Sequence, residues 1–126
     1  MSRALPRPTE SELMILRVIW QFGPCTVRQV VDQLEPGTGY TTVLKLLQIM
    51  TEKGLVIRND SERTHVFAAA QPEHVTQRQL VDDLMTRAFG GSTQKLVLQA
   101  LAGKKPSRTE IAELRQLLKS LESHAP

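Results

Sequence analysis

Apolar residues recur at helical spacing in three segments of residues 9–54, and turn residues separate these segments. The first segment begins at Thr9 in the capping-box sequence Thr-Glu-Ser-Glu and ends at Gly23-Pro24. Its expected buried face consists of Leu13, Leu16, Ile19 and Trp20. The pattern therefore predicts a helix over about residues 9–22. Residues 1–8, which contain two prolines and two arginines, are expected to form a flexible arm.

The second and third segments predict a short helix and a longer one. Thr26 is expected to cap the short helix, and its inner face would consist of Val27, Val30, Val31 and Leu34. The longer helix is expected over about residues 40–53, with Gly54 as its left-handed cap. Its core-facing residues would be Val43, Leu46, Leu47 and Met50. Since residues 43–50 contain more apolar side chains than one face usually buries, Leu44 or Ile49 is expected to be partly exposed.

After Gly54 the apolar period changes from that of a helix to that of a strand. Leu55, Ile57 and then Val66 alternate with polar or charged residues, and residues 59–63 between the two runs are all polar. This pattern predicts a two-stranded hairpin with a protruding tip. Three helices followed by a hairpin are the element order of a winged helix-turn-helix, which is expected over residues 9–70.

The remaining residues, 71–123, are predicted to be helical and to form a dimerisation region. A short helix and a long one, each with a leucine stripe and no large domain to pack on, would leave apolar area exposed in a monomer, and a C2 dimer is the simplest way to bury it. The alternative is that this tail folds back on its own winged domain. The expected dimerisation residues are Leu84, Phe89, Leu96, Leu98, Leu101, Leu114, Leu117, Leu118 and Leu121. The predicted fold is thus mainly α with a small β-hairpin wing, followed by a helical dimerisation region.

Composition narrows the possible functions only slightly. The chain is 40% hydrophobic and 23% charged, which is typical of a globular protein, and its net charge of +3 permits an anionic partner. The single cysteine, Cys25, allows no intrachain disulfide, and the three histidines share no metal-binding spacing. No phosphate-binding glycine loop is present. We therefore expect neither an enzyme nor a bound metal or cofactor. A redox sensor based on Cys25 is a minor alternative.

No apolar run approaches the roughly 18 residues of a membrane span, and no signal-peptide core is recognisable. A cytoplasmic protein without membrane insertion is therefore expected.

The third predicted helix carries the best candidates for contact with double-stranded DNA. Thr41 and Thr42 lie near its start, where short polar groups contact phosphates and base edges, and Lys45 and Gln48 are longer donors that reach bases. The predicted hairpin adds basic and polar groups for the DNA backbone or minor groove. The full expected set is Thr26, Arg28, Tyr40, Thr41, Thr42, Leu44, Lys45, Gln48, Arg58, Arg63 and Thr64. The alternative for each is an ordinary solvated surface.

These residues together resemble the penicillinase-repressor family, the BlaI/MecI/CopY group of bacterial regulators. Residues 9–20 resemble its opening helix, and Val27-Arg28-Gln29-Val30 resembles its second helix. Residues 41–56 resemble its recognition helix and first wing strand. Residues 84–91, Leu96-Val97-Leu98 and residues 110–118 match its dimerisation region. The resemblance covers about residues 9–121.

The resemblance implies a homodimeric repressor that binds a short palindromic operator, often with TACA/TGTA-like half-sites. In some members a membrane sensor-protease releases the repressor by cleaving an Asn-Phe bond within a Leu-Val-Leu segment, so such a protease is a candidate partner. Here Leu96-Val97-Leu98 precedes Gln99-Ala100, which departs from that pattern. The chain also lacks the cysteine pairs of the copper-responsive members. Leu44 and Ile49 stand where the family often has arginine, and Lys45 where threonine is usual.

The rival function is a winged-helix module that binds protein and not DNA. Its best support is the balanced charge of residues 26–65, which contain 5 Lys and Arg against 5 Asp and Glu. Salt dependence separates the two functions, because phosphate contacts weaken steeply as salt rises.

Overall fold

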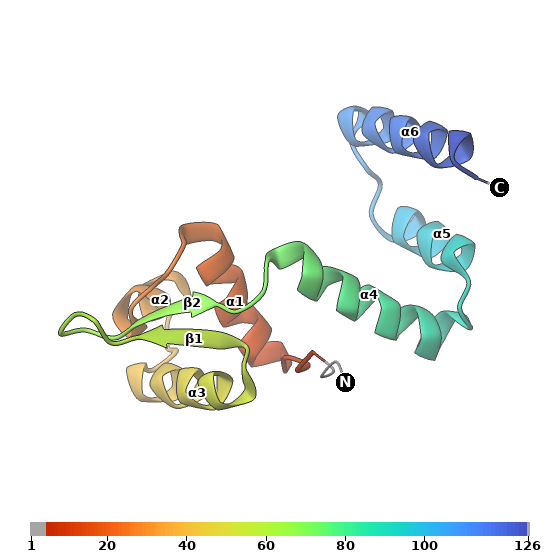
Figure 1. Ribbon diagram of the computed structural model, residues 1–126. Helices are drawn as coiled ribbons and strands as arrows, with labels where there is room; N and C mark the ends of the chain where they lie inside the picture. Colours follow the sequence, from red (N-terminus) through yellow and green to blue (C-terminus); the bar gives the residue numbers. More distant parts are fainter. Residues whose placement is uncertain (1–4, 126) are drawn as a thin grey trace. The chain divides into compact units, whose positions relative to one another are not determined.

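The computed structural model describes residues 5–125, which form six helices and one two-stranded antiparallel sheet (Figure 1). This arrangement confirms the prediction of a mainly helical fold with a β-hairpin. The elements in order are α1 (Glu10–Phe22), α2 (Val27–Gln33), α3 (Tyr40–Lys53), β1 (Val56–Asn59), β2 (Val66–Ala69), α4 (Glu73–Phe89), α5 (Thr93–Gly103) and α6 (Arg108–Ser123).

Capping boxes mark the starts of α1, α2 and α6. At α1 the Thr9 hydroxyl accepts from the Glu12 amide at 3.2 Å, and the Glu12 carboxylate accepts from the Thr9 amide at 2.8 Å. Thr26 with Gln29 and Ser107 with Glu110 form the same reciprocal pair at α2 and α6. Each pair satisfies two backbone donors that would otherwise lack a partner at the helix end.

The end of α3 is a Schellman motif, and it sets the start of the wing. Gly54 has φ +84°, a left-handed conformation that glycine adopts without steric cost. The Leu55 amide then donates to the Met50 carbonyl at 2.9 Å, and both side chains are buried. Because Leu55 belongs to this cap, the alternating strand pattern begins one residue later, at Val56.

The hairpin therefore buries a different face of β1 from the one that the sequence pattern indicated. Its register pairs Val56 with Ala69 and Arg58 with Phe67. Val56 and Phe67 are buried, whereas Ile57, expected among the alternating apolar positions, is 61% exposed. Cys25 also pairs with Phe67 in an isolated bridge, with backbone N–O distances of 3.0 and 2.8 Å.

The core lies among α1, α2, α3 and the hairpin. In Figure 1 the hairpin lies between α1 and α3, and the contacts agree, since β1 packs against α3 and β2 against α1. Helix α1 contacts α2, α3 and β2, so it buries a wider face than predicted. Ile15 and Val18 join Leu16 and Ile19 in the core, while Leu13 and Trp20 are half-buried.

Helix α4 begins in contact with the winged part of the chain. The Trp20 indole nitrogen donates to the Gln71 carbonyl at 3.0 Å. The Gln79 amide donates to the carbonyls of Leu5 and Pro6 at 3.1 and 3.2 Å. Residues 5–8 were expected to belong to a flexible arm, yet residues 5–6 make these contacts and Pro8 is buried. Residues 1–4 of that predicted arm lie outside the described part of the chain.

The chain divides into two compact units, and the boundary falls within α4, between Leu80 and Val81. The second unit contains the end of α4 together with α5 and α6. Within these described residues, neither α5 nor α6 has a buried side chain. None of the helices in the described part of the chain is both long enough and apolar enough to cross a bilayer.

Candidate nucleic-acid interface

Helix α3 separates its apolar and polar residues onto two faces. Val43, Leu47 and Met50 are completely buried and fasten the helix to the core. The exposed face carries Thr41, Thr42, Lys45, Gln48 and Ile49, so four of the predicted contact residues share one solvent-facing surface. Leu44 is half-buried and packs against the core cluster, and Ile49 is 38% exposed. The expectation that one of these two residues would be partly exposed is met by both.

The start of α3 carries an aromatic and cationic pair. The guanidinium of Arg28, on α2, lies 5.0 Å from the centroid of the Tyr40 ring, within the range of a cation–π contact. Both residues are exposed and belong to the predicted contact set. The pair connects the first turn of α2 with the first turn of α3. Thr26 lies nearby at the start of α2, where its hydroxyl accepts from the Gln29 amide at 3.2 Å.

The N-cap of α3 is Gly39, which provides no side-chain hydrogen bond to the helix. The first amides of α3 thus have no side-chain cap, unlike those of α1 and α2. Unsatisfied amides and the helix dipole at such an end favour an anion. Thr41 and Thr42 lie beside these amides, which makes this end of α3 suited to a phosphate group.

The wing supplies the second part of the predicted surface. Arg63 and Thr64 are exposed near its tip, as a contact role requires. Arg58 is already engaged, since its Nε donates to the Asp60 carboxylate at 2.9 Å. The same carboxylate oxygen lies 2.6 Å from Nδ1 of His65. The predicted residues on α3 and on the wing are therefore exposed, except for half-buried Leu44, and Arg58 has a partner within the protein.

An ion pair with one buried partner anchors the other end of α3. Glu12 is 2% exposed, and its carboxylate accepts from Lys53 Nζ at 2.6 Å. Burial alone raises the pKa of Glu12. The hydrogen bond from Lys53, the Thr9 amide and the charge of Lys53 outweigh burial, so the pKa lies below its ordinary value of 4.5. Lys53 Nζ also donates to the Arg7 carbonyl at 3.2 Å, so the last residue of α3 is held from two sides.

Comparison with known proteins identifies the family. The sequence profile of the penicillinase repressor family matches residues 8–120. This chain belongs to the penicillinase repressor family. It is therefore a transcriptional repressor by family, as the resemblance in its sequence indicated.

Individual relatives of the repressor are distant. It is 23% identical over 118 residues to the penicillinase repressor of Bacillus licheniformis, a match that covers 92% of each chain. It is 24% identical over 120 residues to an uncharacterized 16.5 kDa protein of the ptsI 3′ region in Latilactobacillus sakei, covering 94% of this chain and 82% of that protein. A crystal structure of a probable transcriptional regulator from Pseudomonas aeruginosa aligns over 90% of this chain and 78% of that chain, with 20% identity and a TM-score of 0.45.

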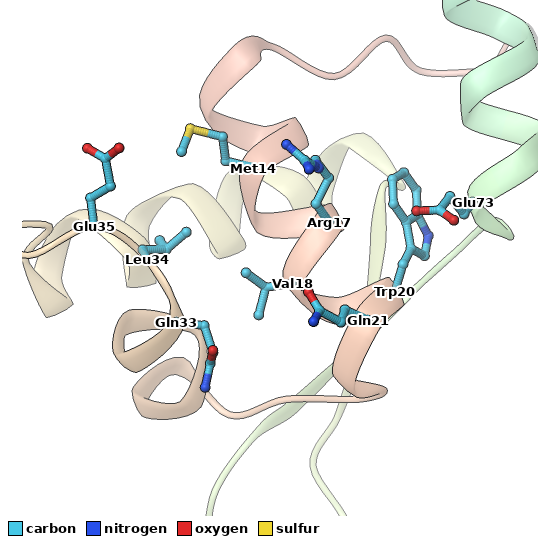
Figure 2. A pocket seen from close by; sticks show the side chains of 9 residues that line it. All are labelled: Met14, Arg17, Val18, Trp20, Gln21, Gln33, Leu34, Glu35 and Glu73. Atoms are coloured by element: carbon cyan, nitrogen blue, oxygen red, sulfur yellow. The ribbon is translucent and has the colours of Figure 1, made fainter. Parts of the chain in front are cut away.

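A cleft of about 480 Å³ on the first unit of the repressor lies outside this surface. Met14, Val18, Trp20 and Leu34 form its apolar part, and its polar lining consists of Arg17, Gln21, Gln33, Glu35 and Glu73. Figure 2 shows Glu35 and Glu73 at opposite ends, with Gln33 pointing away from Arg17. The volume suits a small molecule, but the polar groups do not converge on one point as a binding site requires. We assign no ligand to it.

Cys25 has the properties of a structural thiol. It is buried, its Sγ donates to the Gly23 carbonyl at 3.1 Å, and burial raises its pKa. A raised pKa disfavours the thiolate that redox chemistry needs. In the described part of the repressor, no three His, Cys, Asp or Glu side chains are grouped closely enough to hold a metal.

Sequence reasoning did not find three features of the repressor that bear on this surface. These are the Glu12–Lys53 pair, the cation–π contact and the pairing of Asp60 with His65. The first two join residues from different helices, so no local pattern indicates them. The third depends on the strand register, which places Asp60 opposite His65 and which the sequence pattern did not give.

Proposed function

We propose that this repressor binds operator DNA as a homodimer, with α3 of each subunit in the major groove and the wing on the adjacent backbone. The observation that carries the proposal is the exposed polar face of α3. Thr41 and Thr42, beside the uncapped amides, would position a phosphate, and Lys45 and Gln48 would reach base edges. Arg63 and Thr64 of the wing would add backbone contacts.

Dimerisation is supported by the second unit, in whose described residues most of the leucine side chains are exposed. On α6, Leu114, Leu117, Leu118 and Leu121 recur on one helical face and are each at least 39% exposed. Leu84, Leu98 and Leu101 are also exposed, while Phe89 and Leu96 are half-buried. A second copy of the chain would cover such a face. Two α3 helices would then read an inverted repeat whose half-sites are about 34 Å apart, one turn of DNA.

The experiment that tests this function is selection from a random pool of double-stranded DNA with the purified full chain, followed by sequencing of the bound fraction. Enrichment of an inverted repeat is the expected result, because a symmetric dimer presents the same surface twice. If the folded protein enriches no sequence at low or moderate salt, the proposed function is wrong.

Lys45→Ala should weaken operator binding by about 1–3 kcal/mol if Lys45 reads a base, with the loss confined to sequences that carry that base pair. If Lys45 holds a phosphate, binding to every duplex should weaken alike and the salt slope should fall by about 1. Fluorescence anisotropy titrations at several salt concentrations distinguish the two results. Lys104→Ala is the matched control, since it removes the same charge from an exposed site after α5. Equal binding by Lys45→Ala and wild type would remove Lys45 from the interface.

A protein-docking role is the second candidate, and the balanced charge of residues 26–65 favours it. A docking surface of balanced charge would bind its partner with little dependence on salt, whereas DNA binding weakens steeply as salt rises. Duplex binding whose affinity does not change between low and moderate salt would therefore count against phosphate contacts by α3 and the wing.

A further inference from the structure

One oxygen of Asp60 holds two donors of the wing. Asp60 Oδ1 accepts from Arg58 Nε at 2.9 Å and from His65 Nδ1 at 2.6 Å. A carboxylate has no donor, so the short His65 contact requires a hydrogen on Nδ1. All three side chains are about half exposed, which leaves them within reach of a solvent-borne anion.

The strand register explains why these three side chains meet. Arg58 pairs with Phe67 and Asn59 with Val66, so one further step places Asp60 opposite His65. Side chains of paired residues, and of residues two apart in one strand, point to the same face of a sheet. Near the core this face carries Val56 and Phe67, whose side chains are buried. Beyond the core the same face carries Arg58, Asp60 and His65.

A carboxylate and a phosphodiester compete for the same donors. Both present oxygens that accept charge-assisted hydrogen bonds, and a guanidinium binds either one. In the free protein the carboxylate of Asp60 occupies the position beside Arg58 and His65 that a phosphate group would take. It also cancels the charge that would attract the DNA backbone to this part of the wing.

We propose that Arg58 and His65 form a phosphodiester-binding site on the wing, and that Asp60 competes with the DNA backbone for this site and so lowers the affinity of the repressor. The inference rests on the proposed function, because it assumes that the wing lies along DNA. It adds His65 to the contact residues and gives Asp60 the role of an internal competitor. DNA binding then requires Arg58 and His65 to release the Asp60 carboxylate and to bind a phosphate oxygen in its place.

Asp60→Asn tests the inference, because it removes the charge and keeps the shape of the side chain. Binding to an arbitrary duplex of about 24 base pairs should tighten about three- to tenfold at low salt. The slope of log affinity against log salt should steepen by about 1, since one more phosphate is neutralised. An arbitrary duplex suffices because a backbone contact does not depend on sequence. Unfolding curves should match those of the wild type, since exposed ion pairs contribute little stability.

Two further variants separate local competition from a general change of charge. Glu62→Gln makes the same charge change at the exposed tip, where no ion pair links Glu62 to another described residue, and should alter affinity less than about twofold. Combining Asp60→Asn with Arg58→Gln and His65→Gln should abolish most of the gain, because the freed donors are then absent.

The outcomes distinguish this inference from the proposed function. If the wild type binds no duplex at low salt, the proposed function itself fails. If the wild type binds and Asp60→Asn binds equally or more weakly, only the competition is wrong. A gain that Glu62→Gln reproduces, or that persists without Arg58 and His65, would also overturn it, because the effect would then come from net charge alone.

Discussion

Leu114→Glu combined with Leu118→Glu is expected to convert the repressor into monomers and to weaken operator binding more than about a hundredfold. The two side chains are 39% and 64% exposed in the single chain, so the substitutions should leave the isolated subunit folded. In a dimer seam they would bury four carboxylates without partners, which costs several kcal/mol for each ion. A monomer also loses the second half-site, and with it the gain in affinity that comes from linking two binding events.

Light scattering measures the mass, and titration with an inverted-repeat duplex measures the binding. The matched control is Gln116→Glu combined with Ser120→Glu, which places two carboxylates at the same spacing on the polar face of α6. This control should remain dimeric and bind as the wild type does. A dimeric mass for the leucine variant would show that the seam lies elsewhere, and a monomeric wild type would favour a tail that folds back on its own domain.

The ends of several helices were predictable because capping interactions join residues that are close together in the sequence. Thr9 with Glu12 and Ser107 with Glu110 mark helix starts through bonds that span three residues. Gly54 marks the end of α3 for a comparable reason, since a left-handed residue is needed there. Such signals need no knowledge of the tertiary structure, and the predicted bounds of α3 agree with the observed ones.

The strand register and the buried pair could not be predicted in the same way. Ile57 satisfies an alternating pattern, yet Val56 faces the core because the cap of α3 extends through Leu55. Glu12 reads as a capping residue on an exposed first turn, and only the packing of α1 on α3 brings Lys53 to it. The first case follows from the extent of the helix cap and the second from a tertiary contact, and the pattern of apolar residues indicates neither.

The two ends of α3 are held by different kinds of interaction, and this has a functional consequence. At the start, exposed Arg28 stacks on exposed Tyr40, and the contact can adjust when a ligand arrives. At the end, the ion pair of Lys53 with buried Glu12 holds the helix to α1, and the Gly54 cap ends the helix. In the proposed complex the first turn of α3 meets DNA, while the Glu12–Lys53 pair fastens the opposite end of the helix to α1.

Glu12→Ala is therefore expected to destabilise the winged unit by about 1–3 kcal/mol, because it removes the hydrogen bond to the Thr9 amide and the ion pair with Lys53, whose side chain is 31% exposed. Glu10→Ala, in the same turn but exposed, is the control and should cost less than about 1 kcal/mol. Denaturant unfolding measures both. An equal loss of unfolding free energy in the two variants would mean that the Glu12–Lys53 pair contributes no more than an ordinary acidic residue in the first turn.

The pH dependence separates the ion pair from the cap. Glu12→Gln keeps an oxygen for the Thr9 amide but loses the charge that attracts Lys53. Since the folded-state pKa of Glu12 lies below 4.5, the ionised carboxylate stabilises the folded state at pH values above about 4.5. That contribution is lost as the pH falls through the lowered folded-state pKa. The stability difference between wild type and Glu12→Gln should therefore be constant near neutral pH and shrink in acid, whereas a difference that does not change with pH would assign the effect to packing and not to charge.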